Sequence, residues 1–210
     1  MSVAALLAAG ALACGPAPAA AGNAAQLVTV AAAPGSTLAR LELWAWSGSC
    51  WQRVAGPWRA RVGVAGISAA KREGDDSTPA GVFRIGPTAY GLDANPGWHG
   101  RYHRLGCGDW WDEDPASPSY NRFRHVPCGT SPPFGGGSEA LWRATVAYRE
   151  FAVIEYNAGP VVPGRGSAIF LHDDTGGPTA GCVSLPRPQL LRVLRWLIPA
   201  AHARIAIRIA

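Results

Sequence analysis

The stretch Leu38–Trp46, with the sequence LARLELWAW, alternates between apolar and polar side chains. Successive side chains of an extended chain point to opposite faces, so Leu41 and Leu43 would lie on one face and Arg40 and Glu42 on the other. A core buries leucine readily, whereas arginine and glutamate favour solvent. The pattern therefore predicts a β-strand with one buried face.

Runs of the same kind recur along the chain, separated by glycine and proline. The 26 glycines, 18 prolines and 16% charged residues favour short strands and loops over a helical bundle. One amphipathic helix is predicted over Gln189–Leu197, after two prolines, because its leucines recur on one face. The fold is therefore predicted to be mainly β, with one helix near the C-terminus. The other strand-like runs are Trp51–Val54, Arg59–Ala65, Val82–Ile85, Tyr148–Tyr156, Ser167–His172 and Arg204–Ile209.

The stretch Gly86–Gly137 shows no lasting period and is rich in Pro, Gly, Trp and Asp. A loop this long inside a compact domain is usually functional, so we expect it to form a cap over a site. Cys107 and Cys128 bracket part of it that contains few aliphatic side chains. A disulfide between them is predicted, because such a loop could not hold itself together by packing. A metal site is disfavoured, since neither cysteine belongs to a C-x-x-C pair.

At 210 residues the chain has room for one domain. We expect a signal peptide or lipoprotein signal over residues 1–22, a flexible linker over 23–36 and the folded domain over 37–210. Cys14 is interpreted either as a lipid anchor or as a residue lost with the leader, and Cys50 as a buried free thiol. No later stretch is long and apolar enough to span a membrane. Together these features predict an exported protein.

The formal net charge is +5, and the 19 lysines and arginines are scattered along the chain. Nucleic-acid binding is therefore disfavoured, while a mildly basic surface suits an anionic cell-wall polymer. His99, His103 and His125 could be considered with Asp109 as metal ligands. Their spacing matches no compact ligand signature, so no metal site is predicted.

The most informative run is Ser167–Pro186, SAIFLHDDTGGPTAGCVSLP. An apolar strand ends at His172, a glycine-rich excursion follows, and Cys182 stands at the entry to another apolar segment. A thiol is mostly protonated at neutral pH, so a cysteine nucleophile needs an imidazole close by. A hairpin-like return of the chain would bring the two together. Gly181 lacks a Cβ, so a substrate carbonyl could approach backbone N–H groups that serve as an oxyanion hole.

This run resembles the catalytic segment of the L,D-transpeptidase (YkuD-like) family, in which a His precedes a variable loop and a Ser/Thr-His-Gly-Cys segment. Upstream, Lys71–Phe83 is similar to the family's Lys and Thr-Pro-x-Gly-x-Phe hairpin, and the whole resemblance covers roughly Leu38–Arg187. There are three departures: Ala180 replaces the family's His, Ser184 stands where Arg often lies, and the loop is shorter. The matching residues of the catalytic segment are His172, Thr179, Gly181, Cys182 and Val183.

The resemblance implies a β-sandwich of mixed strands that acts as an exported monomer on peptidoglycan stem peptides, with no metal or cofactor. Cys182 would form an acyl-enzyme with the stem and pass the acyl group to an amine, and His172 would be the general base. The backbone carbonyl of Asp173 would orient the imidazole, and Gly181 and Cys182 would supply oxyanion donors. This chemistry cross-links or remodels the cell wall and so bears on cell shape.

Several side chains are candidates for contact with a stem peptide. Trp111, Tyr120 and Asn121 in the predicted cap could form a wall of the groove, with Thr179 and Ala180 beside the nucleophile. The tryptophans could equally serve only to pack the cap. Two other functions stay open: a cysteine L,D-carboxypeptidase that uses water as the acceptor, and a catalytically degenerate wall-binding module, which the loss of the His at Ala180 favours.

Overall fold

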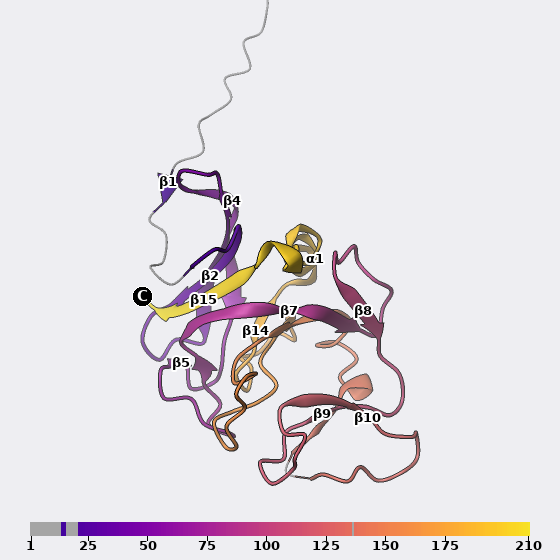
Figure 1. The fold of residues 1–210 in the computed structure, drawn as a ribbon. Coiled ribbons are helices and arrows are strands. Elements are labelled where there is room, and N and C mark those ends of the chain that lie inside the picture. The colour runs from indigo at the N-terminus through magenta and orange to yellow at the C-terminus, as the bar shows by residue number, and fades with distance from the viewer. Residues whose placement is uncertain (1–13, 16–20, 136) are drawn as a thin grey trace, which may run out of the picture.

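The computed structural model describes residues 14–15, 21–135 and 137–210 (Figure 1). Strands dominate these residues, as the sequence predicts. The helical elements are α1 (Arg187–Trp196) and the 3-10 turns η1 (Leu141–Arg143) and η2 (Pro199–Ala201). The strands are β1 (Cys14–Gly15), β2 (Gln26–Ala32), β3 (Leu38–Trp46), β4 (Trp51–Arg61), β5 (Ile67–Ser68), β6 (Thr78–Pro79), β7 (Gly81–Gly91), β8 (Arg101–Arg104), β9 (Asp109–Asp112), β10 (Arg122–His125), β11 (Glu139–Ala140), β12 (Phe151–Ile154), β13 (Phe170–Asp173), β14 (Val183–Leu185) and β15 (Arg204–Ile209).

A ten-stranded sheet forms the body of the molecule, in the order β1-β4-β14-β13-β12-β7-β15-β2-β3, with β8 added beside β7. Strand β3 also pairs with β4, so the sheet closes on itself. The pairings are mixed, since β13–β14 and β15–β2 are parallel and most others are antiparallel. In Figure 1, β7 crosses the middle of the molecule between α1 and the β9–β10 region.

The main core lies on one face of this sheet, where α1 packs. Leu41 and Leu43 of β3 are fully buried there, while Arg40 on the other face is exposed, so the alternation predicted for this strand is confirmed. Leu190 and Leu194 of α1 join the same core. The prediction of a mainly β fold with one amphipathic helix near the C-terminus is therefore confirmed.

The expected linker over residues 23–36 was wrong. Residues 26–32 form β2, which pairs with β3 on one side and β15 on the other. The sequence QLVTVAA shows little alternation because the strand is buried along most of its length and on both faces. Of the expected leader, residues 1–13 and 16–20 lie outside the described residues. Within the described part, none of the helices combines the length and hydrophobicity that a membrane span needs.

The prediction that Cys50 is a free thiol was also wrong, because the structure joins it to Cys14 in a disulfide. This bond fastens β1 next to the start of β4, with which β1 pairs. The predicted disulfide between Cys107 and Cys128 is confirmed. Cys182 is therefore the one free cysteine among the residues that the structure describes.

The cap expected over Gly86–Gly137 is more ordered than one loop. It includes the end of β7, the added strand β8, and β9 and β10 of a small three-stranded sheet ordered β10-β9-β11. The aromatic residues of the cap cover the sheet face opposite α1. Trp111 of β9 packs edge-on against Phe170 of β13, with ring centroids 4.9 Å apart. The cap thus closes a second, aromatic core over β12 and β13.

Replacing Cys107 and Cys128 with Ser should lower the free energy of unfolding by about 3 kcal/mol, because the bond closes a loop across a sequence separation of 21 residues. Urea unfolding followed by tryptophan fluorescence would measure the change. An unchanged unfolding midpoint would show that the cap is held by its aromatic packing alone.

Candidate active site

His172 and Cys182 are brought to neighbouring strands, but not by the hairpin expected from the sequence, which was wrong. Strands β13 and β14 run parallel, with Leu171 opposite Val183 and His172 opposite Ser184. The loop that connects β13 to β14 runs beside the residues that follow β4, and there the Thr179 N–H donates to the Val62 carbonyl at 3.0 Å. Because Leu171 and Val183 point to the main core, the side chains of residues 172 and 182 lie on the opposite face of the sheet, under the cap.

The sulfur of Cys182 is held by the backbone of the segment leading into β13. The Phe170 N–H donates to Sγ at 3.3 Å, and the thiol donates to the Ala168 carbonyl at 3.2 Å. Cys182 is only 9% exposed. Burial, reinforced by the charge of Glu139, raises the pKa of the Cys182 thiol well above its usual range. No hydrogen bond joins this sulfur to His172 in the described part of the chain, so the resting thiol is protonated and satisfied by the backbone.

The His172 ring is oriented by the carbonyl of the next residue. Nδ1 lies 2.7 Å from the Asp173 carbonyl oxygen, which can only accept, so Nδ1 carries the proton of the neutral ring. The Tyr148 ring stands at right angles to the imidazole, with centroids 5.8 Å apart. Burial lowers the pKa of His172 to about 4. At neutral pH the ring is therefore uncharged, with Nε2 able to accept a proton.

The two sequence motifs meet at the backbone of Cys182. Its carbonyl accepts from the hydroxyl of Thr179 at 2.7 Å and from that of Thr78, 104 residues away in sequence, at 3.3 Å. Gly181 has a φ of +147°, and a Cβ there would lie 2.9 Å from the Ser77 carbonyl oxygen. Only glycine fits this position. Its N–H, expected to be an oxyanion donor, is directed to the Thr179 hydroxyl at 3.1 Å.

The cap residues expected to bind substrate are largely used within the protein. Asn121 is buried, and its amide donates to the carbonyls of Tyr156 and Asn157 and accepts from the Trp111 indole. Tyr120 is also buried and binds the carboxylate of Glu73 through its hydroxyl. These contacts are structural. Ala180, in contrast, is exposed on the loop before Cys182.

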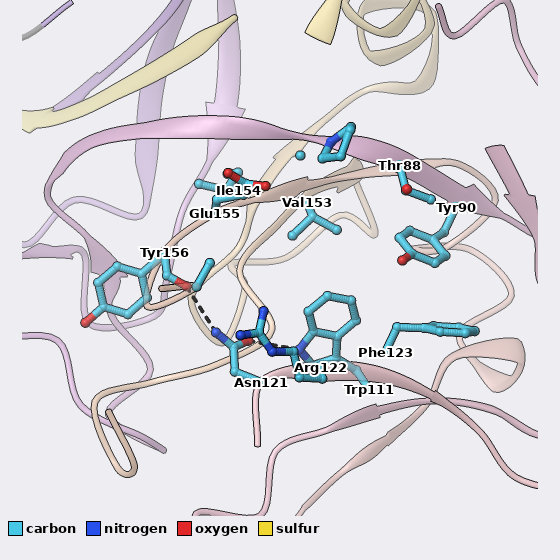
Figure 2. Close-up of a pocket in the computed structure, with 13 residues that line it drawn as sticks. Thr88, Tyr90, Trp111, Asn121, Arg122, Phe123, Val153, Ile154, Glu155 and Tyr156 are labelled. Atoms are coloured by element: carbon cyan, nitrogen blue, oxygen red, sulfur yellow. Dashed lines mark hydrogen bonds between the residues drawn. The ribbon is translucent and has the colours of Figure 1, made fainter. Parts of the chain in front are cut away.

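Trp111 and Asn121 do line a hollow of about 300 Å³ between the cap and strands β7 and β12 (Figure 2). Cys182 and His172 do not contribute to it. Trp111, which lines the hollow, packs on the ring of Phe170, and the backbone N–H of Phe170 contacts the thiol. The hollow therefore lies beside the candidate site, on the same face of the sheet, and is separate from it.

Sequence reasoning missed a cluster of glutamates near the thiol. Glu73 accepts from Ser167 Oγ at 2.6 Å, and Glu139 accepts from the Tyr148 hydroxyl. Burial, with the charges of Glu139 and Glu73, raises the pKa of Glu113 to about 9, and its Oε1 atom has no partner in the described residues. Glu113 is therefore a neutral carboxylic acid at pH 7. Sequence alone gives no sign of this, because β9–β11 pairing brings Glu113 and Glu139 together.

Replacing Glu113 with Gln should stabilise the protein above pH 5, and increasingly so as the pH rises. A carboxyl group whose pKa is raised from 4.5 to about 9 by folding makes its full contribution to the free energy of unfolding below pH 4.5. That contribution is lost as the pH rises through 9. The neutral amide of Gln does not titrate and so removes this loss. In the wild type the free energy of unfolding falls by at most about 1.4 kcal/mol per pH unit for this reason. Urea unfolding at several pH values would test it, with Glu155→Gln, just after β12, as control. A constant difference between Glu113→Gln and wild type across this range would contradict the prediction.

Behind His172, on the main-core side of β13, lies a second charged network. Arg187 binds Glu150 through two hydrogen bonds of 2.5 and 3.2 Å and reaches Asp93 at 2.9 Å. The side chain of Asp173 is buried beside it, and burial together with the charge of Glu150 raises the pKa of Asp173 to about 7. The network ties the start of α1 to Glu150 and Asp93, whereas neither carboxylate oxygen of Asp173 has a hydrogen-bond partner among the described residues.

The histidines considered as metal ligands make hydrogen bonds instead. His103 and His125 both bind the buried carboxylate of Asp109, at 2.8 and 2.7 Å, while His99 lies 2.9 Å from the Arg195 carbonyl. No group of three His, Cys, Asp or Glu side chains suited to a metal ion occurs among the described residues. His103, His125 and Asp109 thus cross-link the cap near the Cys107–Cys128 bond, whereas His99 joins it to α1.

Comparisons with known proteins place this chain beside a protein family and beside distantly similar solved structures. A family model described as the L,D-transpeptidase (YkuD) catalytic domain matches residues 51–205. No curated protein gives a significant match. The crystal structure of the helical cell shape determining protein Pgp2 from Campylobacter jejuni aligns at 14% identity with a TM-score of 0.38, over 87% of this chain and 47% of that one. The chain thus spans less than half of that protein, and a likeness this weak carries no argument.

The family match has direct support in the geometry described above. It covers well over half of the sequence, and it includes both motifs, Thr78-Pro79 and Thr179–Cys182, which meet at one carbonyl. The prediction made from these motifs is confirmed: the chain belongs to the L,D-transpeptidase catalytic domain family.

Proposed function

We propose that this protein is an exported peptidoglycan L,D-transpeptidase with Cys182 as its nucleophile. The thiolate would attack the carbonyl after the third residue of a stem tetrapeptide and expel the terminal D-Ala. The acyl group would then pass to an amine of a neighbouring stem. The observation that carries the proposal is the placement of a single free thiol and a neutral imidazole on one sheet face, at the junction of the two family motifs.

In this mechanism His172 Nε2 takes the proton of the Cys182 thiol and later returns one to the leaving amine. The Asp173 carbonyl holds the ring in the required tautomer. Both partners are neutral at rest, because burial raises the pKa of the thiol and lowers that of the imidazole. The thiolate and the imidazolium would therefore form only in the enzyme–substrate complex. There the substrate would displace the thiol from the Ala168 carbonyl, and its own dipoles would stabilise the two charges.

Cell-wall cross-linking takes place outside the cytoplasm, and two disulfides support such a location for this chain. A leader within residues 1–22 would direct the export, and the catalytic unit would include β2 as well as residues 37–210, because β2 pairs with both β15 and β3. A lipid anchor at Cys14 is not part of the proposal, because its sulfur is bonded to Cys50.

The test is to incubate the full chain with a stem tetrapeptide and a stem carrying a free amine, and to analyse the products by mass spectrometry. A cross-linked dimer with release of D-Ala is expected. Shortened tripeptide without a dimer would assign water as the acceptor and make the protein an L,D-carboxypeptidase. Unchanged tetrapeptide, with retention of the protein on sedimented peptidoglycan, would overturn the proposal in favour of a wall-binding module.

A further inference from the structure

A lysine of the upstream motif reaches the catalytic segment. Lys71 lies in the loop between β5 and β6, and its side chain is only 4% exposed. A Cβ added to Gly181 would lie 3.5 Å from the Nζ atom of Lys71, and one added to Gly166 would lie 3.1 Å from its Cε atom. The stem of Lys71 therefore runs beside Gly166, and its ammonium ends beside the residue that precedes Cys182.

The two segments that Lys71 contacts are also the ones that hold the thiol. Gly181 is joined directly to Cys182, and Gly166 stands two residues before Ala168, whose carbonyl accepts from the S–H group. A side chain at Gly166 would press on the stem of Lys71, so the glycine leaves room for the lysine. Lys71 therefore contacts the backbone on which the position of the sulfur depends.

The ammonium of Lys71 is buried with a single partner. Nζ donates to the Asp75 carboxylate at 2.7 Å, and this is its only hydrogen bond among the described residues, although an ammonium carries three donors. Removing a charge from water is costly unless it is well paired. An ion pair that only fastened the β5–β6 loop could stand in solvent, as the Asp75 side chain partly does. The place of Nζ beside Gly181 therefore indicates a role at the neighbouring thiol.

The charges around Cys182 give Lys71 such a role. Burial, together with the charges of Glu139 and Glu113, raises the pKa of the Cys182 thiol, whereas the charge of Lys71 acts in the opposite direction. The proposed reaction needs negative charge on this sulfur, so the two glutamates oppose it. A cation that is already fixed in a buried site stabilises developing negative charge without having to reorganise. Lys71 therefore offsets the unfavourable field of the glutamates.

We propose that Lys71 stabilises the thiolate of Cys182 while His172 holds the thiol proton. The proton moves from Sγ to Nε2 of the imidazole, the sulfur keeps the electron pair, and the lysine keeps its own protons throughout. Lys71 acts through Cys182 and is therefore a positioning residue, not a catalytic one. This role rests on the proposed function, because the thiolate matters only if Cys182 is the nucleophile. The thiolate itself can be measured without a cell-wall substrate.

The experiment follows alkylation of Cys182 in the full chain by iodoacetamide at pH 8, in which the sulfur displaces iodide, with intact-protein mass spectrometry as the readout. Lys71→Met keeps an unbranched side chain and removes the charge. Loss of a neighbouring opposite charge raises a thiol pKa by about two units, and the greater nucleophilicity of the resulting thiolate offsets about half of that effect. Labelling of Lys71→Met should therefore be about tenfold slower than labelling of the wild type.

Two further variants separate the charge of Lys71 from its ion pair. Lys71→Gln keeps an N–H donor for Asp75 but has no charge, so it should label as slowly as Lys71→Met. The matched control, Asp75→Asn, breaks the ion pair and keeps the ammonium, so it should change the labelling rate less than about threefold. A lysine that served only to fasten the loop would instead make Asp75→Asn as slow as Lys71→Met. Thermal unfolding checks that each variant is folded.

Labelling of both Lys71 variants at the wild-type rate would overturn the proposal, and so would equal slowing by Lys71→Met and Asp75→Asn. The proposed function is tested on the same wild-type sample with the stem tetrapeptide and the amine-bearing stem. A cross-linked product together with unchanged alkylation of the Lys71 variants would remove the role of Lys71 alone. Slower alkylation of these variants without any reaction of the stems would instead count against the proposed function and leave the effect of Lys71 on the thiol in place.

Discussion

Replacing Cys182 with Ala should abolish covalent labelling of the protein by a carbapenem, whose strained carbonyl is an electrophile for the thiol. The other four cysteines are held in two disulfides, so no second free thiol is available among the described residues. Intact-protein mass spectrometry should show the added mass of one carbapenem on the wild type and none on the variant. Peptide mapping of the wild type should place that mass on Cys182.

The control for Cys182→Ala is thermal unfolding, because the change also removes two hydrogen bonds of a buried sulfur. Cys182→Ser is a second variant that keeps a donor and an acceptor at this position. A hydroxyl is a far weaker nucleophile without a strong base, so this variant should also remain unlabelled. Adducts on either folded variant would mean that another group is the nucleophile.

Replacing His172 with Asn should slow acylation of Cys182 by about a thousandfold, within the range that a positioned general base contributes. The Asn amide can still donate to the Asp173 carbonyl, as Nδ1 does now, but it offers nothing in place of Nε2. The change therefore removes the base and keeps the local backbone contact. A time course of carbapenem labelling by mass spectrometry measures the rate.

The pH profile separates the loss of a base from a general structural effect. In the wild type the imidazole is neutral above its pKa of about 4, so the rate should fall only below about pH 5 and be nearly flat near neutrality. In the variant only the thiolate reacts, and burial raises the pKa of the thiol. Its rate should therefore climb about tenfold per pH unit from 6 to 8. Parallel profiles for the two proteins would rule out His172 as the base.

Sequence patterns predict the parts of this fold that have one buried face. Strand β3 has the bounds that alternation predicts, because its alternate residues face the core. Strand β15 also has its predicted bounds, but Ile205, Ala206 and Ile207 are all buried, so the alternation in its sequence is not an alternation in burial. Strand β2 could not be predicted in this way, because its residues are buried on both faces and its sequence shows no alternation. The helix α1 follows its leucines closely.

The candidate site divides in a similar way. The nucleophile and base come from a local motif, so the sequence alone suffices to propose His172 and Cys182. The parallel pairing of their strands depends on a loop that returns beside Val62, and no local pattern indicates this. The glutamates near the thiol and the internal bonds of Asn121 depend on how the cap folds over the sheet, through contacts between residues far apart in sequence.

The burial of Cys182 also affects how long its thiol stays reduced. Outside the cytoplasm, where we propose that this protein acts, no glutathione pool restores an oxidised cysteine, and a free thiolate can also exchange with the protein's own disulfides. Both reactions require the thiolate and access to it. Because the sulfur is buried and the S–H group is hydrogen-bonded to the Ala168 carbonyl, Cys182 offers neither the thiolate nor access to it. The same packing that makes the resting thiol a poor nucleophile therefore preserves it from peroxide and from disulfide scrambling until a substrate arrives.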